Sequence, residues 1–359
     1  MPHARRRPAR LPRRSDASVD LSRLLDVVAA FPRQTICVLG DLVLDEFVSG
    51  EISRVSREAP VLILRHRRRE TYPGGAANAA MNLASLGARV VVAGVIGDDA
   101  GGNTLIDTLR ACKIDVRGVV RAAGWTTPVK TRFLAGWTHT TEQQVLRVDR
   151  EPAGELHDEA LRKLERNARR AARQSDAVLV SDYGFGAATP QLVERLGAKR
   201  TALDSRYRLL DYKDSHITVA TPNESELEAA YHTKVGADTA RLEELGRRAR
   251  QEMGVEALFV TRGKDGLVVF GPPPKGSSGG AGSSHHIPIY GSEEAVDVTG
   301  AGDTVIAVLT LALAAGASHL EAAHLANYAG GIVVMKRRTA TVTRGELEAA
   351  LGSEATAHR

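Results

Sequence analysis

The sequence predicts an α/β protein in which helices cover both faces of a central, mainly parallel β-sheet, and three observations support this prediction. Short apolar runs that end in polar or glycine residues recur along the chain. Segments with the apolar spacing of amphipathic helices separate these runs. The chain has 359 residues, of which 43% are hydrophobic and 25% charged, so a large buried core can form. Strands that alternate with helices are typical of a parallel sheet covered on both faces.

The elements follow one another in a regular order. The predicted strands lie in TICVLGDLVLDEF (35–47), RVVVAGVIG (89–97), DAVLVSDYG (176–184), ITVATPNESE (217–226) and ALFVTRGKDG (257–266). The predicted helices include NAAMNLASLGA (78–88), GGNTLIDTLRAC (101–112), LHDEALRKLERNARRAARQ (156–174) and TARLEELGRRARQEM (239–253). Ligands of such proteins bind at the carboxyl ends of the strands, so we expect the functional residues there.

Two segments depart from this alternation. Residues 46–69 and 127–149 are extended, with polar residues on one side, and we expect them to form a small separate sheet that acts as a lid. Residues 271–289 are rich in Gly, Ser and Pro and are predicted to form a flexible surface loop. Because His285 and His286 have no further ligands nearby in the sequence, a metal site in this loop is not favoured.

The charge and the cysteines limit the class of protein. The net charge is +5, but arginines are concentrated near the N-terminus, so we predict a disordered basic tail over 1–18 and a single domain over 19–352. An RNA-binding or targeting arm is the alternative for the tail. Cys37 and Cys112 have neither disulfide-framework nor zinc-ligand spacing, which favours a cytoplasmic protein. No apolar run reaches the ~20 residues of a membrane span.

The segment DVTGAGD, residues 297–303, places an acid at the start of a predicted apolar helix. A turn through Gly300, Ala301 and Gly302 would direct the first N–H groups and the positive end of the helix dipole at one point, which suits a phosphate. An acid there repels a resting phosphate, but it can accept a proton from a hydroxyl that attacks the phosphate. We therefore interpret Asp303 as a general base; an ordinary acid at a helix N-terminus is the alternative. The chain contains no GxxxxGK[ST] motif, which excludes a P-loop.

A second glycine motif lies in TYPGGAANAAMNLASLG, residues 71–87. Gly74 and Gly75 allow the backbone to approach a ligand closely, and Asn78 is predicted to open a helix of small residues that packs tightly on the sheet. A structural glycine turn is the alternative. The motif gains weight because it occurs together with DVTGAGD.

These two motifs resemble the signatures of a known family. Two glycines followed by Asn78 near the N-terminus, and DVTGAGD near the C-terminus, are similar to the motifs of the PfkB, or ribokinase-like, sugar kinases over about residues 35–348. The resemblance implies an α/β ribokinase-like three-layer fold with a small β-sheet lid. It also implies ATP and Mg²⁺ as cofactors, with a monovalent cation as a further candidate.

Within this family the chain is most similar to the heptose-7-phosphate 1-kinases of ADP-heptose synthesis. The similar segments are SRVSREAPV (53–61), PGGAANAAMNLASLGA (73–88), EQQVLRVD (142–149), LVSDYGFG (179–186) and DVTGAGDTVIAVL (297–309). This resemblance implies ATP-dependent phosphorylation of D-glycero-β-D-manno-heptose 7-phosphate at its anomeric hydroxyl to give the 1,7-bisphosphate. The nucleotidyltransferase domain of bifunctional members is not found in the sequence, so we expect a kinase-only form.

The resemblance implies roles for matching residues in catalysis and sugar binding. Asp303 matches the catalytic base. The anion hole that holds the transferred phosphoryl group matches Gly300, Ala301 and Gly302. The residues implied to bind the sugar hydroxyls are Asp45, Gly74, Gly75 and Asn78.

On the nucleotide side, Asn223 and Glu226 match an NxxE pattern associated with magnesium and phosphates, and Glu226 is expected to act on Mg²⁺ indirectly, through water. The remaining nucleotide-binding residues implied by the resemblance are Thr261, Gly263, Gly266, Asn327 and Gly330.

A substrate that already carries a phosphate requires cations in its site. Lys130, Arg132 and Arg147 lie on the predicted lid strands, and Arg206 follows a predicted buried acid, so we expect these four residues to bind the substrate. Solvated strand faces are the alternative. Heptose kinases commonly have Asp-Pro-Lys where this chain has Asp-Ser-Arg ending at Arg206, a departure that keeps the charge but changes its geometry.

Two other functions remain open from the sequence. One is a PfkB kinase for another sugar, sugar phosphate or nucleoside. The other is a non-catalytic nucleotide-binding regulator or scaffold. The expected partners are a small sugar phosphate and a second copy of the chain that pairs through the lid, whereas a membrane or a nucleic acid is not expected.

Overall fold

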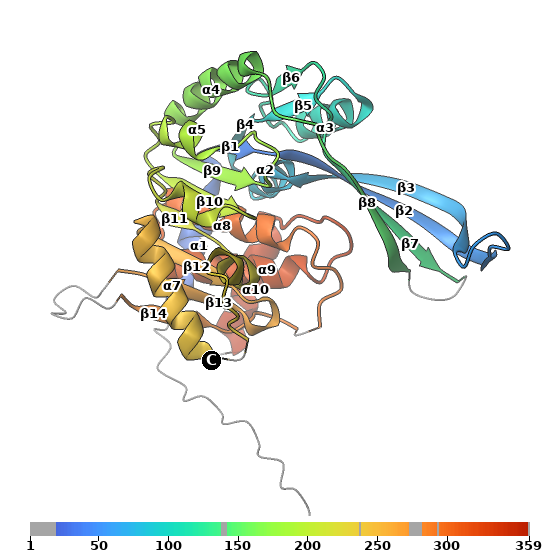
Figure 1. Cartoon of the computed structure of the whole chain (residues 1–359). Coiled ribbons are helices and arrows are strands. Elements are labelled where there is room, and N and C mark those ends of the chain that lie inside the picture. Colours follow the sequence, from blue (N-terminus) through green and yellow to red (C-terminus); the bar gives the residue numbers. More distant parts are fainter. Residues whose placement is uncertain (1–18, 138–141, 237, 273–281, 293, 358–359) are drawn as a thin grey trace, which may run out of the picture.

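The central sheet has eight strands and is parallel except at one edge. Figure 1 shows the computed structural model, which describes residues 19–137, 142–236, 238–272, 282–292 and 294–357. The basic tail predicted over 1–18 lies outside the described residues. In order across the sheet the strands are β14 (Ser284–Ile287), β13 (Leu267–Phe270), β12 (Ala257–Thr261), β11 (Val219–Ala220), β10 (Thr201–Ser205), β9 (Ala177–Asp182), β1 (Thr35–Gly40) and β4 (Arg89–Ala93). Only the β12–β13 and β13–β14 pairs are antiparallel.

Helices cover both faces of this sheet. Alternate residues of β1 illustrate why, since Ile36 and Val38 belong to one buried core and Cys37 and Leu39 to the other. The first core is completed by α1 (Leu21–Ala30), α2 (Ala76–Ser85), α3 (Ala100–Ala111), α8 (Ala301–Ala314), α9 (His319–Val333) and α10 (Arg344–Ala357). The second is completed by α4 (Asp158–Arg173), α5 (Pro190–Glu194), α6 (Glu224–Ala230) and α7 (Thr239–Met253). The predicted three-layer α/β fold is confirmed.

The spacing of apolar residues in a helix explains which of its faces packs against the sheet. In α4 the buried residues Ala160, Leu164, Ala168 and Ala171 recur every three or four positions, while arginines occupy the outer face. By contrast, α8 is buried over most of its circumference because it packs against both α2 and α9. The segment that begins at Ala301 is therefore held firmly in the interior.

The two extended segments form the predicted second sheet. It consists of β3 (Leu62–Gly75), β2 (Leu42–Val55), β7 (Val129–Gly136) and β8 (Gln143–Arg150), in that order; we call it the small sheet. In Figure 1 it extends well to one side of the three-layer body. Strand β2 starts at Leu42, earlier than the predicted bound at residue 46, because it continues almost directly from β1.

Several short elements differ from the sequence prediction. Strand β10 was not predicted, and the run at 89–97 divides, because β5 (Val95–Gly97) leaves the main sheet to pair with β6 (Val120–Ala122). Part of the loop predicted over 271–289 is strand β14, which forms a ladder with β13; residues 273–281 lie outside the described residues. Three 3₁₀ turns complete the described elements: η1 (Phe31–Arg33), η2 (Leu209–Tyr212) and η3 (Gly263–Asp265).

Candidate active site

The carboxylate of Asp303 lies in the first turn of α8 and is almost completely buried. Asn78 Nδ2 donates to its Oδ2 at 2.8 Å, and the Tyr183 hydroxyl donates to its Oδ1 at 3.0 Å. The sequence predicted that Asn78 opens its helix, but this prediction was wrong, because α2 begins at Ala76 with Gly75 as the N-cap. This shift places the Asn78 amide inside the protein, where it faces Asp303.

The surroundings of Asp303 shift its pKa to a value that suits a general base near neutral pH. The pKa of Asp303 is raised to about 7, mainly because the group is buried and to a smaller extent because the Asp45 carboxylate is nearby. The hydrogen bonds from Asn78 and Tyr183, and the charge of Lys130, act in the opposite direction. A carboxyl group with this pKa can exchange a proton at physiological pH.

The turn before Asp303 brings the start of α8 close to Asn78. Gly300 is the N-cap of α8 and has φ of 79°, the left-handed region. A Cβ atom on Gly300 would lie 2.5 Å from Asn78 Nδ2, whereas one on Gly302 would meet nothing within 4 Å. The N–H of Ala301 donates to Val298 O at 3.2 Å, so an anion at the helix start would compete with this turn. Open space at Gly302, beside the helix start, suits a phosphoryl group.

Asp45, on β2, is buried close to Asp303 and has two protein partners. Arg132 Nη1 lies 2.5 Å from its Oδ1, and the Thr339 hydroxyl donates to its Oδ2 at 3.3 Å. A Cβ atom on Gly74 would lie 2.5 Å from Asp45 Oδ2, so only glycine leaves room for this carboxylate. Gly75 has φ of 56°, which explains the second glycine.

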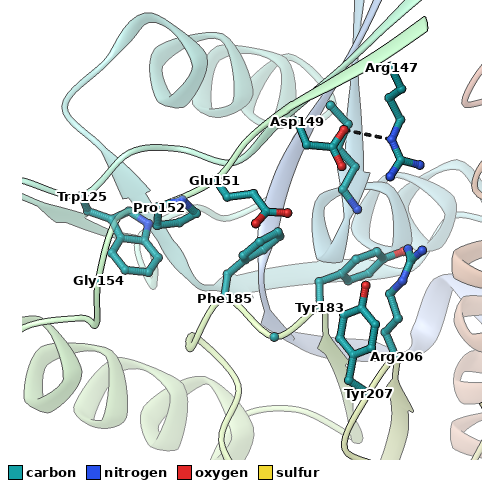
Figure 2. A pocket seen from close by; sticks show the side chains of 12 residues that line it. Trp125, Arg147, Asp149, Glu151, Pro152, Gly154, Tyr183, Phe185, Arg206 and Tyr207 are labelled. Carbon is teal, nitrogen blue, oxygen red and sulfur yellow. Dashed lines mark ion pairs between the residues drawn. The ribbon is translucent and has the colours of Figure 1, made fainter. Parts of the chain in front are cut away.

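Three of the four predicted substrate-binding cations line one pocket of about 390 Å³, which Figure 2 shows. They are Lys130 from β7, Arg147 from β8 and Arg206 after β10. Burial and then the neighbouring Arg206 lower the pKa of Lys130. The fourth, Arg132, lines a different pocket of about 240 Å³, where its charge is paired with Asp45.

Carboxylates and aromatic rings complete the first pocket. Arg147 Nε lies 2.9 Å from Asp149 Oδ1, and Glu151 follows on the same side of the pocket (Figure 2). The cations of Lys130 and Arg206 lie 4.8 Å and 5.9 Å from the centre of the Tyr183 ring. The pocket therefore presents positive charge above an aromatic surface that leads to Asp303.

Asn223 and Glu226 form a reciprocal cap at the start of α6. The Asn223 N–H donates to Glu226 Oε2, and the Glu226 N–H donates to Asn223 Oδ1, both at 2.8 Å. Burial raises the pKa of Glu226; the pKa of Asp204 is raised by burial first and by Glu226 next. The NxxE pattern thus has a structural role, and it also leaves two acids close together.

The remaining predicted nucleotide residues lie along the same side of the sheet. Thr261 ends β12 and its N–H donates to Pro222 O, next to Asn223. Gly263 and Gly266 both have positive φ, in the turn between β12 and β13.

Asn327 and Gly330, the last two residues predicted to bind the nucleotide, lie on α9. Asn327 Nδ2 donates to Pro288 O at 2.8 Å, so this amide fixes the segment after β14. A Cβ atom on Gly330 would be 3.4 Å from Val305, which places this glycine against α8.

The described ranges contain neither a metal-binding cluster nor a membrane-spanning helix. No group of three or more His, Cys, Asp or Glu side chains among these residues is placed to hold a metal ion. No helix in the described part of the chain has the length and apolar character needed to cross a membrane.

A family model described as "pfkB family carbohydrate kinase" matches residues 34–344. The chain belongs to the pfkB family of carbohydrate kinases. The family assignment made from Gly74, Gly75, Asn78 and DVTGAGD is confirmed, and so is the enzyme class.

Curated relatives of this pfkB member are longer than the chain. "Bifunctional protein HldE" of Desulfatibacillum aliphaticivorans is 38% identical over 339 residues, which cover 92% of this chain and 66% of that protein. The protein of the same name from Geobacter sulfurreducens is 39% identical over 322 residues, covering 88% and 62%. The chain therefore spans roughly two thirds of the length of these relatives.

Solved structures confirm the ribokinase-like fold. Phosphofructokinase-2 from Escherichia coli, in complex with potassium, superposes with a TM-score of 0.71 at 17% identity, over 90% of this chain and 99% of that one. Arabidopsis thaliana ribokinase, complexed with ribose and ATP, gives a TM-score of 0.66 at 19% identity, over 89% and 98%.

The structure adds residues that the sequence analysis did not select. Tyr183 contacts Asp303, Thr339 contacts Asp45, and Arg338 joins the main body to the small sheet through Glu70 and Glu142. Asp41 accepts hydrogen bonds from three backbone N–H groups of the loop after β9. The position of Tyr183 and Asp41 at the ends of β9 and β1 was the available signal, because ligands bind at that edge.

Proposed function

We propose that this chain is an ATP-dependent sugar kinase that phosphorylates D-glycero-β-D-manno-heptose 7-phosphate at its anomeric hydroxyl, giving the 1,7-bisphosphate. The observation that carries the proposal is the placement of a buried acid, Asp303, at the start of α8 and beside a pocket with three cations. The substrate itself is inferred from the similarity of the motifs to those of the heptose kinases.

The reaction needs a base and a site for negative charge. Asp303 takes the proton of the attacking sugar hydroxyl as its oxygen forms a bond to the γ-phosphorus of ATP, and the bond from that phosphorus to the ADP oxygen breaks. The turn of Gly300, Ala301 and Gly302 at the start of α8 stabilises the negative charge that develops on the transferred group. Asp45, with Gly74 beside it, orients the sugar.

The existing phosphate of the substrate would bind away from the reacting end. Lys130, Arg147 and Arg206 come from three different strands or their ends and line one pocket, so a phosphate there can accept hydrogen bonds from several directions. It would also relieve the repulsion between Lys130 and Arg206 that contributes to the lowered pKa of Lys130. This pocket favours a sugar phosphate over an uncharged sugar.

The donor set beside α6 suits magnesium. Glu226 and Asp204 are acidic groups whose charged forms are disfavoured by burial, and oxygen ligands of this kind are those that a hydrated Mg²⁺ prefers. Glu226 would hold the ion through water, and bound Mg²⁺ would neutralise charge on the ATP phosphates. ATP would extend along Asn223, Thr261, Gly263 and Gly266. A monovalent cation is a further candidate, tested below with K⁺.

We also propose that two copies pair through their small sheets. Strand β8 is at one edge of this sheet, and Val145, Leu146 and Val148 on it are each about half exposed. Replacing Val145 and Val148 by Lys should give a smaller particle in analytical ultracentrifugation. If the wild-type chain and the variant both have the mass of a single chain, the proposal is wrong.

A substrate panel tests the proposed activity. ATP consumption is measured with Mg²⁺, with and without K⁺, against the manno-heptose 7-phosphate, sedoheptulose 7-phosphate, fructose 6-phosphate, ribose and adenosine. We expect the highest kcat/KM with the manno-heptose phosphate. A preference for another acceptor would retain the kinase and reject the heptose, whereas no turnover of any acceptor would favour a nucleotide-binding regulator.

A further inference from the structure

Tyr183 joins the pocket to the base. Its ring lies under the cations of Lys130 and Arg206, and its hydroxyl donates to Asp303 Oδ1 at 3.0 Å. Figure 2 shows Tyr183 and Arg206 beside each other in this pocket. One side chain therefore contacts both the region expected to bind the substrate phosphate and the group expected to take the proton.

The backbone that carries Tyr183 is fixed by the buried carboxylate of Asp41. The N–H groups of Tyr183 and Phe185 donate to Asp41 Oδ2 at 2.8 Å and 3.0 Å, and the N–H of Ala187 donates to Oδ1 at 2.9 Å. Because three backbone donors converge on one side chain, the segment after β9 has little freedom to move Tyr183 away from α8.

We propose that Tyr183 is a positioning residue, which orients the Asp303 carboxylate and favours its ionised form, and that Asp41 holds Tyr183 in place. The proposal rests on the proposed role of Asp303 as the base. The hydroxyl acts on Oδ1 while Asn78 acts on Oδ2, so each oxygen of the acid is directed by a different donor. A carboxylate held at both oxygens presents a defined lone pair to the sugar hydroxyl.

The charges around Asp303 agree with this role. Burial of the group and, to a smaller extent, Asp45 from β2 favour the protonated acid, whereas the two hydrogen bonds and Lys130 from β7 favour the carboxylate. Asp204 at the end of β10 is a further acid in the electrostatic environment of Asp303. Removal of the Tyr183 hydroxyl withdraws one of the few contributions that lower the pKa of Asp303.

The test compares Tyr183→Phe with a matched control, Tyr212→Phe. The Tyr212 hydroxyl also donates to a buried carboxylate, that of Asp182, at 3.0 Å, but this acid does not contact Asp303. Both variants keep the ring and lose one oxygen. The kcat of the full-length chain is measured from about pH 5 to pH 10 with the preferred acceptor, a range that spans the expected titration of the base.

We expect Tyr183→Phe to lower kcat at neutral pH and to move the acid limb of the pH profile upward by about one to two units, because a hydrogen bond to a charged group is lost. Its kcat should recover toward the wild-type value at high pH. Tyr212→Phe should leave the acid limb in place. An unchanged limb in Tyr183→Phe, or a loss that is equal at every pH, would overturn the proposal.

A second readout does not depend on turnover. The titration of the Asp303 carboxyl carbon is followed by ¹³C NMR in aspartate-labelled protein and assigned by its absence in Asp303→Asn. An upward shift of this titration in Tyr183→Phe, but not in Tyr212→Phe, supports the positioning role even if no acceptor in the panel is phosphorylated. An unshifted titration rejects it even if the kinase activity is present.

Discussion

Arg132 Nη1 lies 2.5 Å from Asp45 Oδ1, and the side chains are only 13% and 8% exposed, respectively. The acid expected to bind the sugar is thus paired with an arginine that the sequence analysis had assigned to the substrate phosphate. Because the pair is buried, each charge depends on the other for compensation.

Removing only one charge of this pair should lower the free energy of unfolding more than removing both charges. Arg132→Met leaves Asp45 buried without its partner, and we expect it to lower the free energy of unfolding by about 3 kcal/mol or more. Addition of Asp45→Asn to Arg132→Met should recover part of that loss. Urea denaturation measures both. Equal stability of Arg132→Met and the wild type would show that the pair does not hold in solution.

The second prediction concerns the chemical step. Asp303→Asn removes the proton acceptor and should lower kcat by about 10² to 10⁴-fold, while ATP binding measured by calorimetry persists. Substantial turnover by this variant would exclude Asp303 as the base.

Stability should depend on pH through the same group. The pKa of Asp303 is about 7 in the folded protein and about 3.8 for an ordinary aspartate, as in the unfolded chain, so its contribution to stability is fully present below about pH 4 and is lost as the pH rises to 7. Asp303→Asn cannot ionise. The stability of Asp303→Asn relative to the wild type should therefore increase between about pH 4 and pH 7 and change little above pH 8, as measured by denaturant midpoints. Asp41, with a pKa raised by burial to about 6, is present in both proteins and cancels.

The turn at Gly300 should not tolerate a side chain. Gly300→Ala introduces a Cβ 2.5 Å from Asn78 Nδ2 at a residue with positive φ, so we expect a displaced Asn78 and a loss of kcat. Gly345→Ala is the matched control, because its Cβ would meet nothing within 4 Å on helix α10. Similar activity of the two variants would contradict the importance of the Gly300–Asn78 contact.

The cation pocket should distinguish phosphorylated from unphosphorylated acceptors. Lys130→Met should raise KM for the preferred sugar phosphate by about tenfold or more, since a charge-assisted hydrogen bond is lost. It should change KM for ATP little. Steady-state kinetics with each substrate varied in turn measures this, and an unchanged KM for the sugar phosphate would place its phosphate elsewhere.

Residue type and spacing were sufficient to predict the two sheets and to select Asp303 and Asn78 as candidate site residues, which the structure places in contact. Asp303 follows a glycine turn before an apolar helix, and Asn78 follows paired glycines; both are local patterns. The small sheet was detectable because its strands alternate polar and apolar residues over long segments.

Other features of the fold and the site could not be predicted, because they depend on contacts between residues that are distant in the sequence or on segments too short to show a pattern. Arg132 lies beside Phe47 in the parallel β2–β7 register, two residues beyond the Asp45–Lys130 neighbours, and its side chain reaches back to Asp45. Strand β11 has two residues, too few to show a period. Tyr183 lies in the segment LVSDYGFG and follows a strand, but neither observation shows that its hydroxyl reaches Asp303, 120 positions away in the sequence.

The hydrogen bond between Asn78 and Asp303 joins residues 225 positions apart, and the one between Tyr183 and Asp303 spans 120 positions. During synthesis on a ribosome, Asn78 and Tyr183 therefore emerge long before the acid they contact. Contacts between residues so distant in sequence form late, since a long loop must close first. We expect nascent chains that end before α8 to build much of the parallel sheet while the polar groups of the catalytic centre remain without their partner.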